Sequence, residues 1–453
     1  MTFRAPRTRA LALGAVVCAA CSGVPESEVR GPRSLSEDVR QKLAELSPAE
    51  LPGPPEDATN GYLGDPRLAE LGKQFFYEKR FSGALLDEAN NGNPGTLGMV
   101  GETGKVSCTG CHIPEAGFLD NRSPRGQISL GAGWTHRRAP SLLNVAQATF
   151  LMWDGRRDTV YSQPFTPLED PSEFNSSRLF VAQQIKRLYA EPYEAIFGPL
   201  PSLDQYEPVA AADAGCNELP KDIAHGGCDK PGENDPDVTR VVVNFGKAIQ
   251  GFTRQITCGR GRFDQWMDGD ESALSADEKA GAQLFVGKAG CNQCHYGPFL
   301  TDQRFHNIGM NPDFTLFIAA FDDPGASDGV ARMLVDPLNS KGVYSDGYDN
   351  RYDRLPQNLD RVLGAFRTPS LRCVSRRPSF MHTGQYRSLD DVVIFFNRGG
   401  HTPAKYLGTS ENYPRNLNDA ERAQLVAFLK ALDGEGPNPD LLIPPTLPPD
   451  PVE

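Results

Sequence analysis

Two short segments of this sequence place two cysteines and a histidine at a spacing that can attach a haem. They read Cys108-Thr109-Gly110-Cys111-His112 and Cys291-Asn292-Gln293-Cys294-His295. Thiols at this spacing add to the two vinyl groups of a haem, and the adjacent histidine becomes the proximal ligand of the iron. The chain has 10 cysteines and 7 histidines in 453 residues, so random placement would give about 0.003 such motifs. The sequence therefore predicts two covalently bound c-type haems, with a redox pair of cysteines or half of a zinc site as the alternatives.

Four further cysteines, outside both motifs and outside the N-terminal segment, predict disulfide bonds. They are Cys216, Cys228, Cys258 and Cys373. An even number of cysteines in an oxidising compartment favours two disulfides, and four cysteines allow three pairings. We prefer Cys216 with Cys228, because both lie in one irregular segment rich in glycine and proline, which leaves Cys258 with Cys373. Buried free thiols are the alternative.

The first residues of the chain are typical of an export signal. Three arginines are followed by an apolar run from Ala10 to Ala20, which is too short to span a membrane. The small residues before Cys21 resemble the cleavage site of a bacterial lipoprotein, in which Cys21 would carry the lipid; cleavage after Ala20 without a lipid is the alternative. Haem attachment of this type also takes place outside the cytoplasm. The sequence therefore predicts a periplasmic protein, anchored to the bacterial outer membrane as a lipoprotein.

The composition suits a globular protein of two domains. With 39% hydrophobic residues in 453, the chain can bury substantial cores. The net charge of −12, without acidic blocks, argues against a nucleic-acid partner. The predicted segments are a signal (1–21), a tether (22–60) with one short helix near 36–46, an N-terminal cytochrome c-like domain (61–236), a C-terminal cytochrome c-like domain (237–433), and a proline-rich tail without a packed role (434–453).

The surroundings of the two haem motifs repeat along the chain. A helix opening at Asp65-Pro66 precedes the first motif, and a helix opening with a capping box at Ser275 precedes the second. Downstream, Arg138-Ala139-Pro140-Ser141-Leu142 recurs as Arg367-Thr368-Pro369-Ser370-Leu371, and Trp153 and His382 stand 13 residues after the respective prolines. Helical apolar stripes lie within 241–256 and 425–432, and no long alternating strand pattern is present. The predicted fold class is mainly α, with two cytochrome c-like haem lobes related by an internal repeat and long loops.

Over residues 60–433 the sequence resembles the bacterial di-haem cytochrome c peroxidase and MauG superfamily. Besides both haem motifs, the resemblance rests on Ala139-Pro140-Ser141-Leu142-Leu143-Asn144, Trp153-Asp154-Gly155-Arg156, Phe263-Asp264-Gln265-Trp266, Phe305-His306-Asn307-Ile308-Gly309, Phe366-Arg367-Thr368-Pro369-Ser370-Leu371 and Asn397-Arg398-Gly399-Gly400. It implies that the N-terminal haem meets hydrogen peroxide and that the C-terminal haem transfers electrons.

The resemblance assigns roles to three side chains near the N-terminal haem. Trp153 matches a tryptophan between the two haems, where an indole that can be transiently oxidised divides one long electron jump into two. Gln163 and Glu173 follow at the spacing by which the family positions a glutamine and a glutamate over the peroxidatic iron. Glu173 can carry a proton between the two oxygens of peroxide, and Gln163 can orient peroxide or water by hydrogen bonds. Taken alone, these residues would be a packed core tryptophan and two solvated surface side chains.

The sequence departs from the family pattern above the first haem. Many members carry a histidine there, in a Gly-His-Gly-Trp segment, which blocks the peroxidatic iron. This chain has Ala132 at that position, and alanine cannot bind iron. The departure predicts an open, five-coordinate first haem, with His136 as a substitute ligand in the alternative.

A second departure lies above the C-terminal haem. The distal position of the family falls on Phe396, which has no atom that can bind iron. Either the second haem is also five-coordinate, or His401, Met381 or Tyr386 has replaced the usual ligand. We rank His401 first among these three.

Four other residues bear on the interpretation. His306 and His382 are expected to be hydrogen-bonded structural histidines. The family holds a calcium ion between its lobes through an asparagine, whose position here is Arg138, and Arg377 lies near the second contributing segment. Guanidinium groups oppose a divalent cation, so the resemblance does not carry calcium over to this chain.

These observations lead to three hypotheses of function. The first is a peroxidase that reduces hydrogen peroxide with electrons from a small periplasmic cytochrome c or copper protein. The second, favoured by the unblocked first haem, is a MauG-like enzyme that uses peroxide to oxidise a residue on a partner protein. The third is a di-haem electron carrier without catalysis, which would keep both haems six-coordinate and would not need Gln163 or Glu173.

Overall fold

The computed structural model describes residues 1–2, 30–32, 34–122, 128–216, 230–312 and 323–451. Almost all of the predicted signal, together with Cys228, lies outside these residues. Within them, no helix is long and apolar enough to cross a membrane. The chain folds mainly as α-helices joined by long loops, which confirms the predicted fold class at this level.

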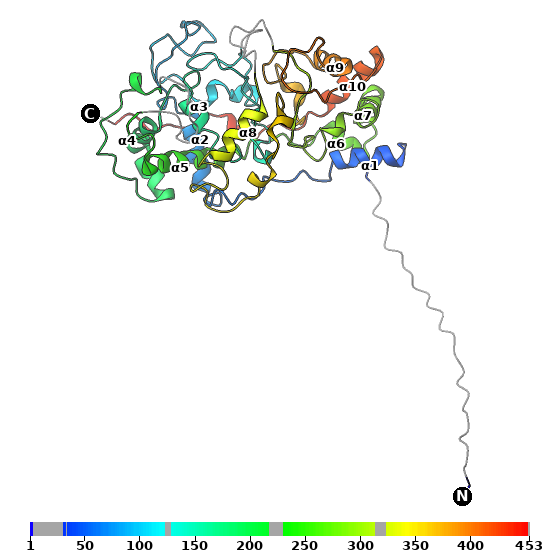
Figure 1. Ribbon diagram of the computed structural model, residues 1–453, viewed down its shortest axis with the longest axis horizontal. Coiled ribbons are helices and arrows are strands. Elements are labelled where there is room, and N and C mark those ends of the chain that lie inside the picture. The colour runs from blue at the N-terminus through cyan, green and yellow to red at the C-terminus, as the bar shows by residue number, and fades with distance from the viewer. Residues whose placement is uncertain (3–29, 33, 123–127, 217–229, 313–322, 452–453) are drawn as a thin grey trace.

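The helices fall into two groups, and one helix lies between them (Figure 1). One group contains α2 to α5, the other contains α1, α6, α7, α9 and α10, and α8 lies near the middle. Strands β1 and β2 form one short antiparallel pair. The elements are α1 (Glu37–Leu46), α2 (Pro66–Tyr77), α3 (Phe165–Glu169), α4 (Arg178–Phe197), α5 (Pro236–Thr253), α6 (Arg262–Met267), α7 (Ala276–Val286), β1 (Phe305–His306), α8 (Ala326–Val335), β2 (Phe366–Arg367), α9 (Leu389–Arg398) and α10 (Asp419–Ala431).

The helices before the two haem motifs begin where their capping residues predict. The Asp65 carboxylate accepts a hydrogen bond from the N–H of Arg67, and Pro66 occupies the first position of α2. At α7, the Ser275 hydroxyl accepts from the N–H of Glu278, whose carboxylate accepts from the N–H of Ser275. The local sequence therefore determines where each of these helices starts.

The first hydrophobic cluster is built on the crossing of α2 and α5. The rings of Phe75 and Phe245 stack there at 5.0 Å between centroids. A Cβ atom on Gly72 would meet the carbonyl oxygen of Ala248 at 1.8 Å, so only glycine permits this close approach. The cluster includes buried residues of α5 and continues past the end of this helix to Cys258. Helix α5 thus packs with the N-terminal half, whereas the sequence placed it after the 236/237 boundary in the C-terminal domain.

The second hydrophobic cluster is built in the same way on α7 and α10. Phe285 and Phe428 meet edge to face at 5.3 Å, and a Cβ atom on Gly281 would lie 2.0 Å from the carbonyl oxygen of Gln424. Helix α1 adds Leu43 and Leu46 to this cluster. The segment predicted as a tether therefore contains a packed helix, because its two leucines find a partner surface far along the chain.

The C-terminal tail also has a packed role, contrary to the expectation from its prolines. It leaves α10 in the second group of helices and ends beside α4 in the first (Figure 1). Leu441 is 8% exposed and belongs to the first cluster. Lys73 of α2 donates to the carbonyl oxygen of Asp440 at 2.7 Å, and Arg80 donates to that of Pro448 at 2.9 Å. Proline-rich sequence can form an ordered strap when its carbonyl groups find donors.

Local backbone features recur in the two halves at a constant separation of 229 residues. A 3₁₀ turn covers Val145–Gln147 and another covers Val374–Arg376. Each is followed by a methionine in the left-handed region, Met152 with φ 62° and Met381 with φ 70°. The bridges Leu151–Arg157 and Phe380–Tyr386 enclose these methionines. The loops that present Trp153 and His382 therefore have the same local shape.

A disulfide joins Cys258 to Cys373, with 6.1 Å between their Cα atoms. This confirms the predicted pairing of these two cysteines. Cys216 is also disulfide-bonded, but its expected partner Cys228 lies outside the described part of the chain.

Candidate functional site

Two internal cavities of similar size lie in the protein, and each has one predicted haem motif in its wall. Cys108, Cys111 and His112 line a cavity of about 450 Å³. Cys291, Cys294 and His295 line a second cavity, of about 440 Å³. Both volumes lie within the range of about 300–1,000 Å³ that is usual for sites of small molecules and cofactors.

The two motifs adopt the same backbone conformation. In each, a 3₁₀ turn starts at the first cysteine, and the histidine N–H donates to the carbonyl oxygen of that cysteine at 2.9 Å. The four cysteines of the motifs form no disulfide with any described residue. Each turn therefore directs two thiols and an imidazole into one cavity, as covalent attachment of a haem requires.

The electrostatic state of the two histidines suits an iron ligand. Burial lowers the pKa of His112 and the pKa of His295 to about 4, so both imidazoles are neutral near pH 7. Nδ1 of His295 lies 2.8 Å from the carbonyl oxygen of Leu300. Because a carbonyl oxygen can only accept, Nδ1 carries the hydrogen and Nε2 remains available to bind a metal. The residues present thus fit two covalently attached haems.

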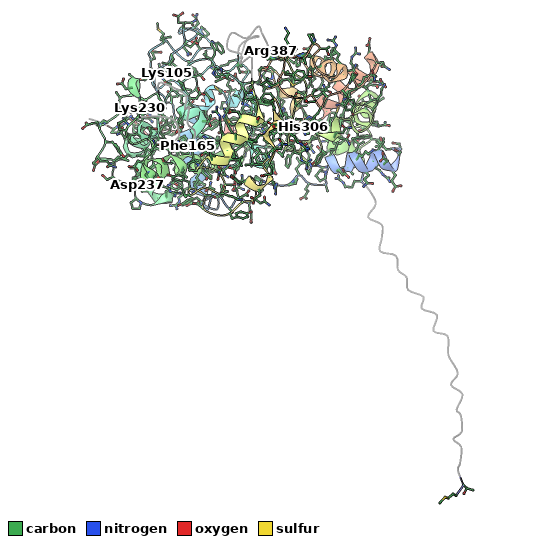
Figure 2. All side chains as sticks on the ribbon, in the orientation of Figure 1. Lys105, Phe165, Lys230, Asp237, His306 and Arg387 are labelled. Carbon is green, nitrogen blue, oxygen red and sulfur yellow. A yellow bond between two sulfur atoms is a disulfide. The ribbon has the colours of Figure 1, made fainter. Side chains whose placement is uncertain are left out.

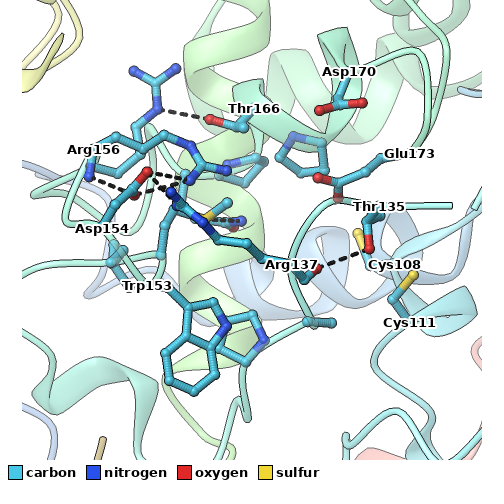
Figure 3. Close-up of a pocket in the computed structure, with 18 of the residues that line it drawn as sticks. Cys108, Cys111, Thr135, Arg137, Trp153, Asp154, Arg156, Thr166, Asp170 and Glu173 are labelled. Carbon is cyan, nitrogen blue, oxygen red and sulfur yellow. Dashed lines mark hydrogen bonds and ion pairs between the residues drawn. The ribbon is translucent and has the colours of Figure 1, made fainter. Parts of the chain in front are cut away.

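Three candidate residues from the sequence come together at the first cavity. Trp153, Gln163 and Glu173 all line it. Figure 3 shows Trp153 and Glu173 in this cavity with Cys108 and Cys111. Gln163 precedes α3 in the chain, and Glu173 lies in the loop that follows α3. A short helix therefore determines the separation of these two side chains.

Glu173 has an unusual electrostatic environment. Burial raises the pKa of its carboxyl group to about 8; the neighbouring charge of Asp170 adds to this rise, and Arg156 opposes it. Among the described residues, no donor forms a hydrogen bond with the Glu173 carboxyl group. At pH 7 the side chain is therefore mostly protonated with a minor ionised fraction, so it can give or take a proton near neutral pH.

Trp153 lies at the boundary of the two cavities and lines both of them. Its Nε1–H donates to the carbonyl oxygen of Arg138 at 2.7 Å, and the N–H of Arg138 donates to the carbonyl oxygen of His382 at 2.8 Å. The Trp153 and His382 rings are 6.4 Å apart between centroids. The indole is thus held in one orientation between the two candidate haem sites.

A group of ion pairs fixes the loop that carries Trp153, and sequence reasoning assigned it no role. Asp154 pairs with Arg137 at 2.5 Å and with Arg156 at 2.8 Å, and Arg137 pairs further with Asp323 at 2.6 Å. These charges hold the pKa of Asp154 well below its usual range. The Trp-Asp-Gly-Arg motif already contained two of these partners, but nothing in the sequence indicated that Arg137 and Asp323 would join them.

The Ala132 segment supports the first cavity without lining it. Ala132 is fully buried in the first hydrophobic cluster, and its N–H donates to the carbonyl oxygen of Glu173 at 2.8 Å. The side chain at this position therefore brings no ligand into the cavity. His136 does line the cavity.

The second cavity contains Phe396 at the expected distal position and excludes His401 from its lining. Nδ1 of His401 accepts from the N–H of Asn311 at 2.9 Å, and Nε2 lies 2.8 Å from the hydroxyl of Tyr386. With both nitrogens engaged, His401 does not fit the role of iron ligand that we ranked first. Of the three alternatives only Met381 lines this cavity.

His306 and His382, the other two histidines that line the second cavity, both contact neighbouring side chains. His306 belongs to β1 and lies in the opposite half of the molecule from Phe165 of α3 (Figure 2). His306 is 2.8 Å from Asp302 and 2.6 Å from Glu411, and the ring of His382 stacks on Phe366 at 3.7 Å. Both contacts agree with structural roles.

Comparison with known proteins identifies the family. The family model described as "Di-haem cytochrome c peroxidase" matches residues 66–272. The cytochrome-c peroxidase IdrP1 of Denitromonas iodatirespirans is 30% identical over 406 residues, which cover 86% of this chain and 87% of that protein. The chain belongs to the di-haem cytochrome c peroxidase and MauG superfamily. Membership of this superfamily implies peroxidase-type oxidoreductase chemistry and two c-type haems.

Other members of the superfamily are similar over most of their length. The methylamine utilization protein MauG of Methylorubrum extorquens is 28% identical over 429 residues, which cover 93% of this chain and 92% of that protein. The diheme peroxidase BthA of Burkholderia thailandensis has the same fold, with a TM-score of 0.59 and 22% identity over 85% of this chain and 95% of that structure.

Proposed function

We propose that the protein reduces hydrogen peroxide at the first haem with electrons delivered through the second haem by a small periplasmic redox protein. One observation carries this proposal: Gln163 and Glu173 share a cavity with the first haem motif, while Trp153 borders both cavities. A simple electron carrier would need neither polar side chain there. The reaction consumes one hydrogen peroxide, two electrons and two protons and produces two waters.

The residues of the first cavity have different roles in the proposed reaction. Cys108, Cys111 and His112 would hold the first haem, which would supply the redox chemistry and the binding of peroxide. Glu173 takes the proton from the inner oxygen of peroxide and returns it to the outer oxygen, which then leaves as water. A group with a pKa of about 8 can do both near neutral pH. The Gln163 amide holds peroxide or water by hydrogen bonds.

Trp153 passes electrons from the second haem site to the first. Its position at both cavities supports two short transfers in place of one long transfer. The Nε1–H is bonded to a peptide carbonyl group, 2.7 Å away. A carbonyl oxygen is a very weak base, so the indole keeps its proton while it is oxidised.

The lining of the same cavities supports a proposal for the coordination of the two irons. We propose that the first haem is five-coordinate, because Ala132 offers no ligand. A ferric spectrum that is wholly low-spin at room temperature would contradict this and would point to His136. At the second haem, Met381 is the candidate that the cavity retains, and a five-coordinate iron is the alternative.

The organisation of the chain is part of the proposal. The shared local features at a separation of 229 residues support two related cytochrome c-like lobes, with the boundary after α5. Export by residues 1–21, with a lipid on Cys21, would place the protein at the periplasmic face of the outer membrane. Buried guanidinium groups at Arg138 and Arg377 argue against calcium between the lobes.

A MauG-like reaction is the second candidate. In that reaction the electrons come from a residue on a partner protein, which becomes oxidised. Ala132 favours it, because an iron without a distal ligand needs no prior reduction to meet peroxide. The similarity to the methylamine utilization protein MauG over 93% of this chain also supports it.

Peroxide-driven oxidation of a reduced small cytochrome c tests the first candidate. We expect steady turnover by the protein loaded with two haems, and a loss of about 10²–10⁴-fold in Glu173→Gln. Glu191→Gln, a change of the same kind at an exposed site on α4, should leave turnover intact. Turnover that survives in Glu173→Gln would rule out the proton-carrying role. Rapid reaction of the ferric haem with peroxide but no cytochrome oxidation would favour the MauG-like reaction, and an unchanged Soret band would favour the carrier.

A further inference from the structure

Three arginine side chains line the second cavity, two of them at its boundary with the first, and none forms an ion pair with a described carboxylate. Arg138 and Arg367 line both cavities, whereas Arg377 lines only the second. The other arginines of the first cavity differ in this respect. Arg137 and Arg156, for example, pair with Asp154.

Within the described part of the chain, the hydrogen bonds of these three side chains go to backbone carbonyl groups. Arg138 donates to Asp120, Arg367 to Met152 and Arg377 to Ser370, at 2.6, 3.3 and 2.5 Å. Nη1 of Arg138 and Nε of Arg377 are buried without any partner. Arg138 as a whole is only 5% exposed. Donors buried in this way are rare in native proteins unless a further partner is bound.

The charges of the three groups are only partly compensated. Burial lowers the pKa of each to about 10, and the charges of Arg138 and Arg367 contribute to the lowering at Arg377. Asp120 opposes the lowering at Arg138 and Asp433 opposes it at Arg377, whereas no carboxylate opposes it at Arg367. All three guanidinium groups still carry a positive charge at neutral pH. Buried charges that are not fully compensated are unfavourable, so the arrangement favours binding of an anion.

We propose that Arg138, Arg367 and Arg377 form a shared binding site for the propionate carboxylates of the two haems. Arg138 and Arg367 serve both haems, and Arg377 serves only the second. The proposal rests on the two-haem protein described under the proposed function. A haem keeps two carboxylates after its vinyl groups have reacted, and guanidinium groups bind carboxylates by charge-assisted, often paired hydrogen bonds.

A shared site has a consequence for the redox properties of both haems. A nearby positive charge favours the reduced iron, which carries one positive charge fewer than the oxidised iron, so it raises the reduction potential. Because Arg138 and Arg367 face both cavities, each acts on two potentials at once. Arg377 acts on only one.

Reduction potentials of each haem, measured by spectroelectrochemistry on the fully loaded protein, test this site without any peroxide. We expect Arg138→Gln to lower both potentials and Arg377→Gln to lower only that of the second haem. A tenfold change in the ratio of oxidised to reduced haem corresponds to about 59 mV for one electron, and we expect each affected haem to change at least tenfold. Arg138→Lys, which keeps the charge, should restore most of the difference.

The controls distinguish a shared propionate site from a general effect of charge and from a free anion. Arg240→Gln removes the same charge from the exposed surface of α5 and should shift neither potential, because solvent and salt screen it. If Arg138→Gln does not load two haems, Arg377→Gln decides alone: equal shifts at both haems, or no shift, would overturn the proposal. Potentials of the unaltered protein that follow added inorganic phosphate would also overturn it, in favour of a free anion. Peroxide turnover is scored separately, so either proposal can fail while the other stands.

Discussion

At the scale of single residues, the position of Glu173 depends on its backbone and not on bonds to its side chain. Its carbonyl oxygen accepts from the N–H of Ala132, and a Cβ atom on Gly131 would lie 2.7 Å from the same oxygen. The two segments therefore fit closely, while the carboxyl group is left free to exchange a proton. Ala132, at the position where many family members carry a histidine, thus holds the loop of Glu173 through its peptide group.

The raised pKa of Glu173 predicts the pH dependence of the reaction. Only the ionised carboxylate can take a proton from peroxide, and with a pKa of about 8 this form is a minority at pH 7. The value of kcat/KM for peroxide should therefore rise from pH 6 to pH 9 with an apparent pKa near 8. Steady-state kinetics across this range provide the measurement.

The Glu173→Gln variant supplies the control for this profile. Its residual activity should lose the rise near pH 8, because an amide does not ionise in this range. A rise that persists unchanged in the variant would assign the ionisation to another group.

At the scale of secondary structure, the two hydrophobic clusters are built on helix crossings of the same kind. Gly72 lets α2 meet α5, and Gly281 lets α7 meet α10, each with the backbone of the partner helix directly against the glycine. Close helix contact brings the following haem motif to a fixed distance from the rest of its lobe. The repeat in the sequence hinted at this, because both glycines lie in the segments that recur before the two motifs.

Substitution of Gly72 by alanine tests the importance of this crossing. Because the new methyl group would lie 1.8 Å from the carbonyl oxygen of Ala248, α2 and α5 must separate. We expect a loss of about 3 kcal/mol in the free energy of unfolding, at the upper end for overpacked cores. Urea unfolding followed at the Soret band provides the measurement. Gly64→Ala, where a Cβ atom meets nothing within 4 Å, should be close to neutral.

At the scale of the whole molecule, segments distant in sequence hold the two halves together. The tail after α10 crosses to α2, and helix α1 joins the second cluster although it precedes the whole first half. Helix α1, from the N-terminal part of the chain, thus packs in the second half, and the C-terminal tail packs in the first half. The relative position of the two cavities, and hence of Trp153, depends on these connections as well as on the loops between the lobes.

Substitution of Leu441 measures how much the tail contributes to the free energy of unfolding. This leucine is 8% exposed within the first cluster, so Leu441→Ala should lower the free energy of unfolding by about 2 kcal/mol. Ile443, two residues further on, is 60% exposed, and Ile443→Ala should change stability by less than about 0.5 kcal/mol. Thermal unfolding of both variants makes the comparison. Equal effects would mean that the tail does not pack in solution.

Sequence reasoning succeeded for features of the structure that are encoded within short segments of the chain. The haem motifs, the capping residues and the spacing of Trp153, Gln163 and Glu173 are encoded within short segments, and these residues gather at the cavities as expected. The roles assigned to Trp153, Gln163 and Glu173 also required the resemblance to a family.

Features that depend on distant partners were the ones that sequence reasoning missed. Nothing near α1 or Leu441 in the sequence indicates which surface covers them. His401 has the right chemistry near the right place, but contacts with Tyr386 and Asn311 direct it elsewhere.

The disulfide between Cys258 and Cys373 has a consequence for how the protein is made. Its two cysteines are 115 residues apart, and the thiols of the second haem motif, Cys291 and Cys294, lie between them. If the chain is exported N-terminus first, as proposed, both motif thiols reach the oxidising compartment before Cys373 does. Cys258 would then meet these two thiols before its native partner, so early capture of the motif thiols by haem, or later exchange of a mispaired disulfide, would be needed for correct maturation.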